Sequence, residues 1–185
     1  MKSIVKTNIF LVILVTLLSA SGANAGGIGK NIVVLLAGTG YADFSGTQFM
    51  QLGLTPPPNV ACFDMDLVDA KTGNVIGSGS DCLSEVGFSD TGGVMLTATS
   101  FFHFPGGTLV SEGLVTVQPV LHGSTGYTHV TGAVPSPSEN NVIYGDGKFK
   151  KAAGSVRLSG LVDMTNFAFG AGDPIVFDCV FVIDI

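Results

Sequence analysis

The side chains with the widest chemical options in this chain are its three histidines, His103, His122 and His129. A histidine serves as a metal ligand or as a general base near neutral pH, but either role needs partner groups beside it. The three lie in different segments, without an H-x-H or H-E-x-x-H pattern and without a nearby cysteine pair. We therefore expect no metal site and no cofactor.

Two polar side chains beside aromatic or apolar strands are candidate ligand contacts. His103 alternates with Phe102 and Phe104, so it points away from them and either lines a barrel lumen or lies on the rim. Arg157, the single arginine, can bind a ligand carboxylate bidentately or pair with a neighbouring aspartate. Together with Tyr144, these residues form the predicted ligand contacts.

The carboxylates and serines give weaker indications of a catalytic or metal-binding site. Asp64, Asp66 and Asp69 could transfer protons or hold Ca²⁺, but no D-x-D-x-D-G loop is present, so a solvated outer face opposite Ser78 and Ser80 is the simpler interpretation. The segment 77–81, with sequence GSGSD, resembles a nucleophile elbow only superficially because it lies within a strand. Hydrolase chemistry is therefore not expected.

The cysteines occur at positions 62, 82 and 179. Residues 60–83 predict a hairpin with its turn at 71–73, and this register places Cys62 directly opposite Cys82, where side chains approach closely enough for a disulfide. We expect that pair to be oxidised and Cys179 to remain a buried free thiol, with pairing of Cys179 to either of the other two as the rival. Phe63, Met65 and Leu67 lie on the other face of this hairpin, opposite Asp81, Gly79 and Gly77.

The elements that must position these residues are nearly all strands. Period-2 apolar runs recur between Gly- and Pro-rich turns, and no segment shows a sustained helical period with capping signals. Expected strands cover residues 31–37, 47–54, 60–69, 75–83, 94–104, 108–120, 127–134, 141–144, 155–164 and 175–185. The chain is therefore predicted to be all-β, a single closed antiparallel β-barrel of about eight strands, whose last strand returns to the first.

Residues 1–25 have the form of a cleaved signal peptide. Two lysines precede an apolar run at residues 9–18, and small residues lead to the Ala23-Asn24-Ala25 site. The run is too short to span a bilayer. We expect a secreted or periplasmic protein with one domain over residues 26–185 and no membrane span after cleavage.

The overall composition limits the partners. The chain has 185 residues, 26 glycines and a formal net charge of −6, with only 12% charged residues. An acidic chain without clustered Lys and Arg does not suit nucleic acid, so no nucleic-acid partner is expected.

Residues 142–160 carry the most distinctive pattern in the chain. They contain Gly145, Gly147, Phe149, Ala152 and Gly154, which resemble the G-x-G-x-F-x-x-A-x-G hairpin of the dirigent and allene oxide cyclase barrel-like superfamily. The chain looks most similar to bacterial secreted members. The resemblance implies an eight-stranded barrel with a lumen open at one end, often a trimer. Plant members cyclise a fatty-acid epoxide or guide the coupling of phenoxy radicals, but no catalytic residue transfers to this sequence.

These observations predict a secreted barrel that binds a small hydrophobic molecule in its lumen. The resemblance adds a cyclase (isomerase) or dirigent-type activity as an expectation, without a cofactor. The alternative is a non-catalytic structural or interaction barrel, in which aromatic and aliphatic side chains would plug the lumen.

Overall fold

The computed structural model describes residues 30–88, 90, 93–119, 127–134 and 141–185. The predicted signal peptide and His122 lie outside these residues. The elements, in chain order, are β1 (Asn31–Tyr41), α1 (Thr47–Gln51), β2 (Ala61–Asp69), β3 (Val75–Phe88), β4 (Val94–Phe104), β5 (Gly107–Pro119), β6 (Tyr127–Val134), β7 (Val142–Gly145), η1 (Gly147–Phe149), β8 (Ser155–Asp163) and β9 (Pro174–Asp184).

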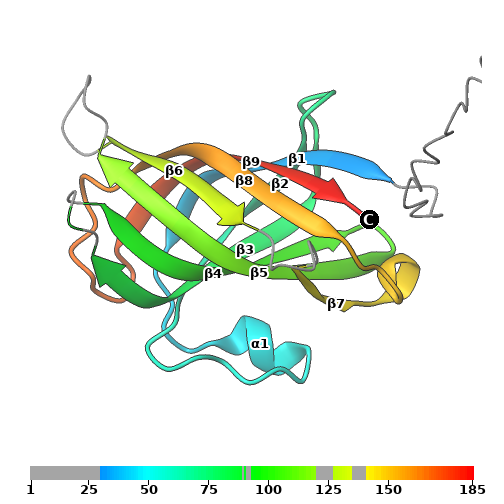
Figure 1. Ribbon diagram of the computed structural model, residues 1–185, viewed down its shortest axis with the longest axis horizontal. Helices are drawn as coiled ribbons and strands as arrows, with labels where there is room; N and C mark the ends of the chain where they lie inside the picture. The colour runs from blue at the N-terminus through cyan, green and yellow to red at the C-terminus, as the bar shows by residue number, and fades with distance from the viewer. Residues whose placement is uncertain (1–29, 89, 91–92, 120–126, 135–140) are drawn as a thin grey trace, which may run out of the picture.

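All strands belong to one antiparallel sheet, which curls strongly around a common interior (Figure 1). The strand order is β4-β3-β2-β1-β9-β8-β6-β5-β7, and β4 also pairs with β5. The last strand lies against the first along its whole length, from Asn31 opposite Asp184 to Tyr41 opposite Pro174. The predicted all-β class and the return of the last strand to the first are confirmed.

The predicted closed barrel needs a correction at one seam. β6 pairs with β8 only as far as Gly132 opposite Leu158, and the four-residue β7 then continues beside β5. Between β7 and β8 the described residues form no ladder. The buried Asn141 side chain bridges this gap instead, accepting a bond from Val156 N (2.7 Å) and donating to Val156 O (3.0 Å). The sheet is therefore a curled, open barrel-like sheet.

The β2–β3 hairpin has the predicted register. Cys62 lies opposite Cys82, and Phe63 lies opposite Asp81. Cys62 and Cys82 are joined by a disulfide, and Cys179 is free and buried. The predicted cysteine pairing is confirmed.

Residues 47–54, expected as a strand, form the short helix α1 and the turn after it. The three prolines at 56–58 keep this segment out of a ladder, and it lies against the outer face of the sheet. Phe49 of α1 packs edge-to-face on Phe101, with ring centroids 5.0 Å apart. This contact covers the disulfide, so part of the outer face is a second, small apolar core rather than a solvated surface.

The glycine-rich motif forms one end of the sheet. Phe149 is buried and packs on Phe104, with ring centroids 5.1 Å apart, and Ala152 packs against the interior. Lys148 Nζ lies 5.4 Å from the Phe104 ring centroid and 5.0 Å from that of Phe149, within cation–π distance. The motif therefore caps the interior at this end.

Gly147 has a φ of +49°, and a Cβ added there would overlap the backbone oxygen of Gly106. We expect Gly147→Ala to lower the free energy of unfolding by about 2 kcal/mol or more, because strain in φ adds to a backbone clash. Chemical denaturation measures the loss. Gly53→Ala is the control, because Gly53 has a φ of +71° and open space around its Cβ position; equal losses in both variants would contradict the clash.

Candidate functional site

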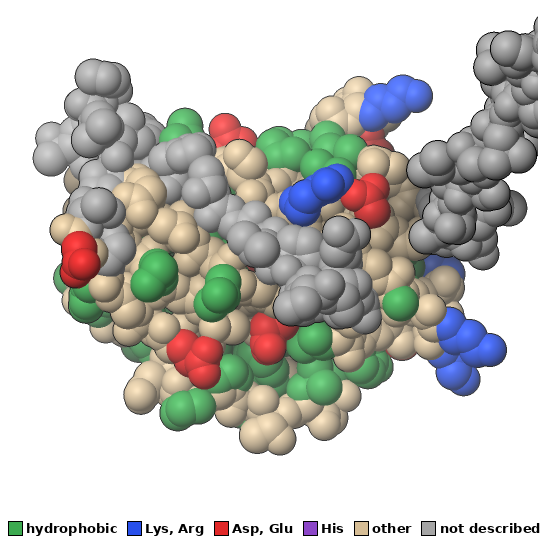
Figure 2. All heavy atoms as spheres, in the orientation of Figure 1, with side chains coloured by type: hydrophobic (Ala, Val, Ile, Leu, Met, Phe, Trp, Pro, Cys, Tyr) green, Lys and Arg blue, Asp and Glu red, His purple; other side chains and the backbone are tan. Residues whose placement is uncertain are grey.

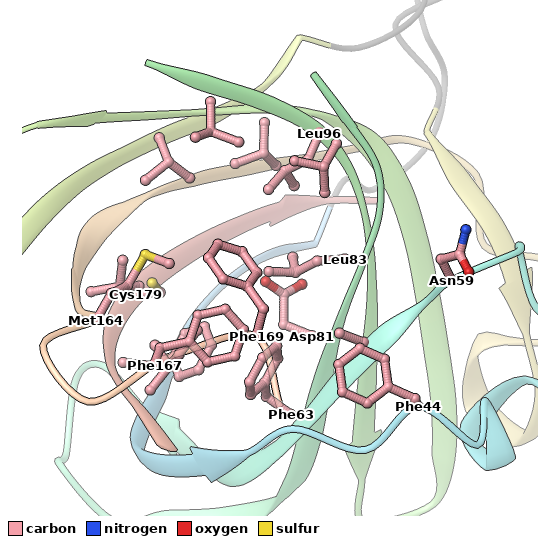
Figure 3. A pocket seen from close by; sticks show the side chains of 18 of the residues that line it. Phe44, Asn59, Phe63, Asp81, Leu83, Leu96, Met164, Phe167, Phe169 and Cys179 are labelled. Carbon is pink, nitrogen blue, oxygen red and sulfur yellow. The ribbon is translucent and has the colours of Figure 1, made fainter. Parts of the chain in front are cut away.

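A cavity of about 170 Å³ lies at the end of the curled sheet opposite the glycine-rich motif. Its walls come from β2, β3, β4, β5, β8, β9, the β8–β9 connection and the two segments that flank α1 (Figure 3). An engineered apolar cavity of roughly 150 Å³ takes up benzene, so this space suits a small organic molecule. The lining residues are Phe44, Asn59, Ala61, Phe63, Asp81, Leu83, Val86, Phe88, Val94, Leu96, Val115, Val117, Val162, Met164, Phe167, Phe169, Ile175, Phe177 and Cys179.

Phenylalanine rings dominate one wall. Phe63 on β2 contacts Phe177 on β9 and Phe167 on the β8–β9 connection, with ring centroids 5.5 Å and 5.8 Å away. Phe169 follows, 4.7 Å from Phe167. Phe63 is fully buried whereas Phe169 is 72% exposed, so the aromatic wall runs from the interior out to the mouth.

Asp81 is the charged residue in this apolar lining. It points inward because strand alternation places it on the same face as Leu83, and the close view shows its carboxylate inside the cavity (Figure 3). Its side chain is buried, and the Ser100 hydroxyl donates to Oδ1 at 2.7 Å. Burial raises the pKa of Asp81 to about 6, and the Ser100 bond opposes this shift. The carboxyl therefore titrates close to neutral pH.

Cys179 lies on the same cavity wall from β9. Burial, followed by the negative charge of Asp81, raises the pKa of its thiol to about 12. The thiol therefore stays protonated at physiological pH, and the thiolate needed for nucleophilic chemistry does not form.

None of the three predicted ligand contacts lines this cavity. His103 Nδ1 lies 3.2 Å from Thr108 Oγ1, and the backbone N–H of Thr108 donates to Asp146. The Tyr144 hydroxyl reaches the other oxygen of Asp146 at 3.5 Å. His103 and Tyr144 are thus brought together at the capped end through Thr108 and Asp146.

Arg157 is separate from that group. It pairs with Asp184 at 2.6 Å, and its side chain is 55% exposed. The interpretation that this arginine pairs with a neighbouring aspartate is confirmed.

Asp64 and Asp69 of the β2–β3 hairpin have structural partners, whereas Asp66 is exposed. Asp64 accepts hydrogen bonds from Ser80 and Gln48. Asp69 caps the turn, and hydrogen bonds from Thr72 lower the pKa of Asp69. No cluster of three or more His, Cys, Asp or Glu within the described ranges could hold a metal ion.

Asp81 was missed as a site residue although its signal is present in the sequence. The hairpin register already places it on the core face, opposite Phe63. A charged side chain at a core position is rare unless it is paired or functional. A charged residue at a position that faces the core could therefore have identified this site.

Comparison of the chain with known protein families, with curated proteins and with solved structures finds no match. Among the described residues, no helix is long and apolar enough to cross a membrane. The cavity is therefore the feature of this protein that points to a function.

Proposed function

We propose that this protein binds a small hydrophobic molecule in the cavity at the open end of its sheet. The observation that carries the proposal is an apolar space, lined by aliphatic side chains and phenylalanine rings, with one buried carboxyl group in its wall. Ligand sites commonly combine an apolar lining with a few convergent polar groups that orient the ligand. A purely structural barrel would fill this space with its own side chains.

Ligand binding is better supported than catalysis. The Cys179 thiol is held protonated, and His103, Tyr144 and Arg157 lie away from the cavity. An isomerase or dirigent-type activity rests on the resemblance of residues 142–160 to that superfamily, as does assembly into a trimer. Ligand binding depends neither on such an activity nor on a trimer.

We further propose that the protein acts outside the cytoplasm, in the periplasm or as a secreted protein. The signal-like residues 1–25 motivate this proposal, and the Cys62–Cys82 disulfide supports it because such bonds persist in oxidising compartments.

A cavity-filling variant tests the binding proposal. Ala61 lines the cavity from β2, and Ala61→Phe places a ring in the space that a ligand would occupy. We expect propylbenzene to bind the wild type and to lose at least about tenfold in affinity in this variant, because overlap of ring and ligand costs more than about 1.4 kcal/mol. Titration calorimetry or protein-observed NMR measures both affinities.

Ala70→Phe is the control, because Ala70 is exposed at the β2–β3 turn. Wild-type protein that binds neither propylbenzene nor any probe of the same shape with a polar head would contradict the proposal and favour the structural alternative. Equal binding by Ala61→Phe and wild type would place the ligand elsewhere. Native mass spectrometry of protein from its source then identifies a molecule that remains bound.

A further inference from the structure

The Asp81 carboxylate lacks a counter-charge of its own. Its side chain is 5% exposed and receives the hydrogen bond from Ser100. Within the described part of the chain, no lysine, arginine or histidine forms an ion pair with it. A buried charge without a partner destabilises the folded protein. A ligand that supplies a positive charge would therefore gain binding free energy by neutralising it.

The phenylalanine rings beside Asp81 also favour a positively charged ligand. Phe63 lies directly opposite Asp81 in the β2–β3 register, and Phe167 and Phe177 pack on Phe63. The faces of aromatic rings attract ammonium groups, and cages that combine such rings are a common means of binding them. A carboxylate next to phenylalanine rings therefore recognises both the charge and the hydrocarbon of an organic cation.

The distribution of charged side chains also favours a cationic ligand. In the space-filling view, the visible lysine and arginine side chains gather toward the end that carries the glycine-rich motif, away from the β8–β9 connection (Figure 2). At the cavity end, Glu85 lies next to the lining residue Val86, and Asp163 lies between Val162 and Met164. Negative charge near this end attracts cations and repels anions such as fatty-acid carboxylates.

We propose that the ligand is a small apolar amine whose ammonium group pairs with the Asp81 carboxylate while its hydrocarbon part fills the phenylalanine-lined space. This inference rests on the proposed binding function and specifies its ligand class. A cavity of about 170 Å³ fits one ring with a short chain. The ammonium would donate to Asp81 Oδ2, the carboxylate oxygen that does not accept from Ser100.

Three probes of similar shape test this proposal, namely 2-phenylethylamine, 2-phenylethanol and propylbenzene. The full oxidised protein is titrated with each near neutral pH by calorimetry. We expect the amine to bind at least about tenfold tighter than propylbenzene and tighter than the alcohol, because only the amine brings a positive charge to the buried carboxylate. In Asp81→Asn, which keeps an oxygen for Ser100, the advantage of the amine should vanish. Asp66→Asn is the control, since Asp66 is exposed and carries the same charge.

Acidification provides a second test on the unmodified protein. Because Asp81 titrates at a pKa of about 6, its charged fraction at about pH 5 is roughly a tenth, and the amine should lose about tenfold in affinity while propylbenzene does not. Cys179 faces Asp81 from β9, but its thiol stays protonated over this range. Ser100 on β4 and Phe63 on β2, which also face Asp81, do not titrate.

The outcomes separate the two proposals. Equal binding of amine and propylbenzene, an alcohol that binds as tightly as the amine, or a preference that survives in Asp81→Asn would overturn the amine inference and leave the binding function standing. Wild-type protein that binds none of the three probes would overturn both.

Discussion

Replacement of both Cys62 and Cys82 by alanine is expected to lower the free energy of unfolding by about 3 kcal/mol from chain entropy alone. The bond closes a segment with a sequence separation of 20, so its loss frees this part of the unfolded chain. Both cysteines are also fully buried beneath Phe49 and Phe101, and truncation weakens that packing. Urea denaturation of the oxidised wild type and of the double variant gives the difference.

Cys179→Ala is the control for this experiment, because it removes a buried thiol without removing a cross-link. We expect a smaller loss, on the order of 1 kcal/mol, from reduced packing. A double variant as stable as the wild type would show that the cross-link does not constrain the unfolded chain. Peptide mapping without reductant provides an independent check, since a linked fragment that contains Cys179 would contradict the observed pairing.

The substitution Asp81→Asn should stabilise the protein by about 3 kcal/mol at pH 7.5, because it removes the cost of ionising a carboxyl group whose pKa is raised by burial. Burial raises the pKa of Asp81 from its ordinary 3.8 to about 6, so the folded state holds this proton more tightly than the unfolded state does. The free energy of unfolding of the wild type therefore falls as pH rises from about 4 to about 6, and the loss is complete above that range. Asparagine keeps an oxygen for Ser100 and carries no charge, so the variant should lack this decline.

Denaturation curves between about pH 4 and 8 for wild type, Asp81→Asn and Asp66→Asn measure this effect. Asp66 is exposed, so its replacement should change stability by less than about 0.5 kcal/mol. A wild type whose stability does not decline over this range, or an Asp81→Asn variant less stable at pH 7.5, would contradict the account of Asp81 as a destabilising buried charge.

A residue that weakens the fold in this way is typical of a functional site. An apolar side chain at position 81 would complete the hydrophobic lining without the desolvation cost. Asp81→Asn should therefore have two opposite effects. It should raise the free energy of unfolding, because a buried charge is removed, and it should abolish the preference for the amine, because that charge is what the amine binds.

Short-range patterns were enough to predict most of the strands and the register of one hairpin. Alternation along 60–69 and 75–83, together with one tight turn, determined which residues face each other, and the Cys62–Cys82 bond followed from that register. Alternation along β9 likewise identified Phe177, Cys179 and Phe181 as buried. These predictions succeeded because the side-chain period of a strand is two, so a single anchored pair determines the whole face.

The sequence by itself thus determined the all-β class, the main hairpin and its disulfide, since these depend on neighbouring residues and local turns. Only the tertiary structure decided that residues 47–51 form a helix over the disulfide, that the seam between β7 and β8 is bridged by Asn141, and that Asp81 faces a cavity rather than a filled core. Each of these features depends on contacts between segments far apart in the chain. Local periodicity carries no information about such contacts, because it specifies which face a side chain takes but not what packs against that face.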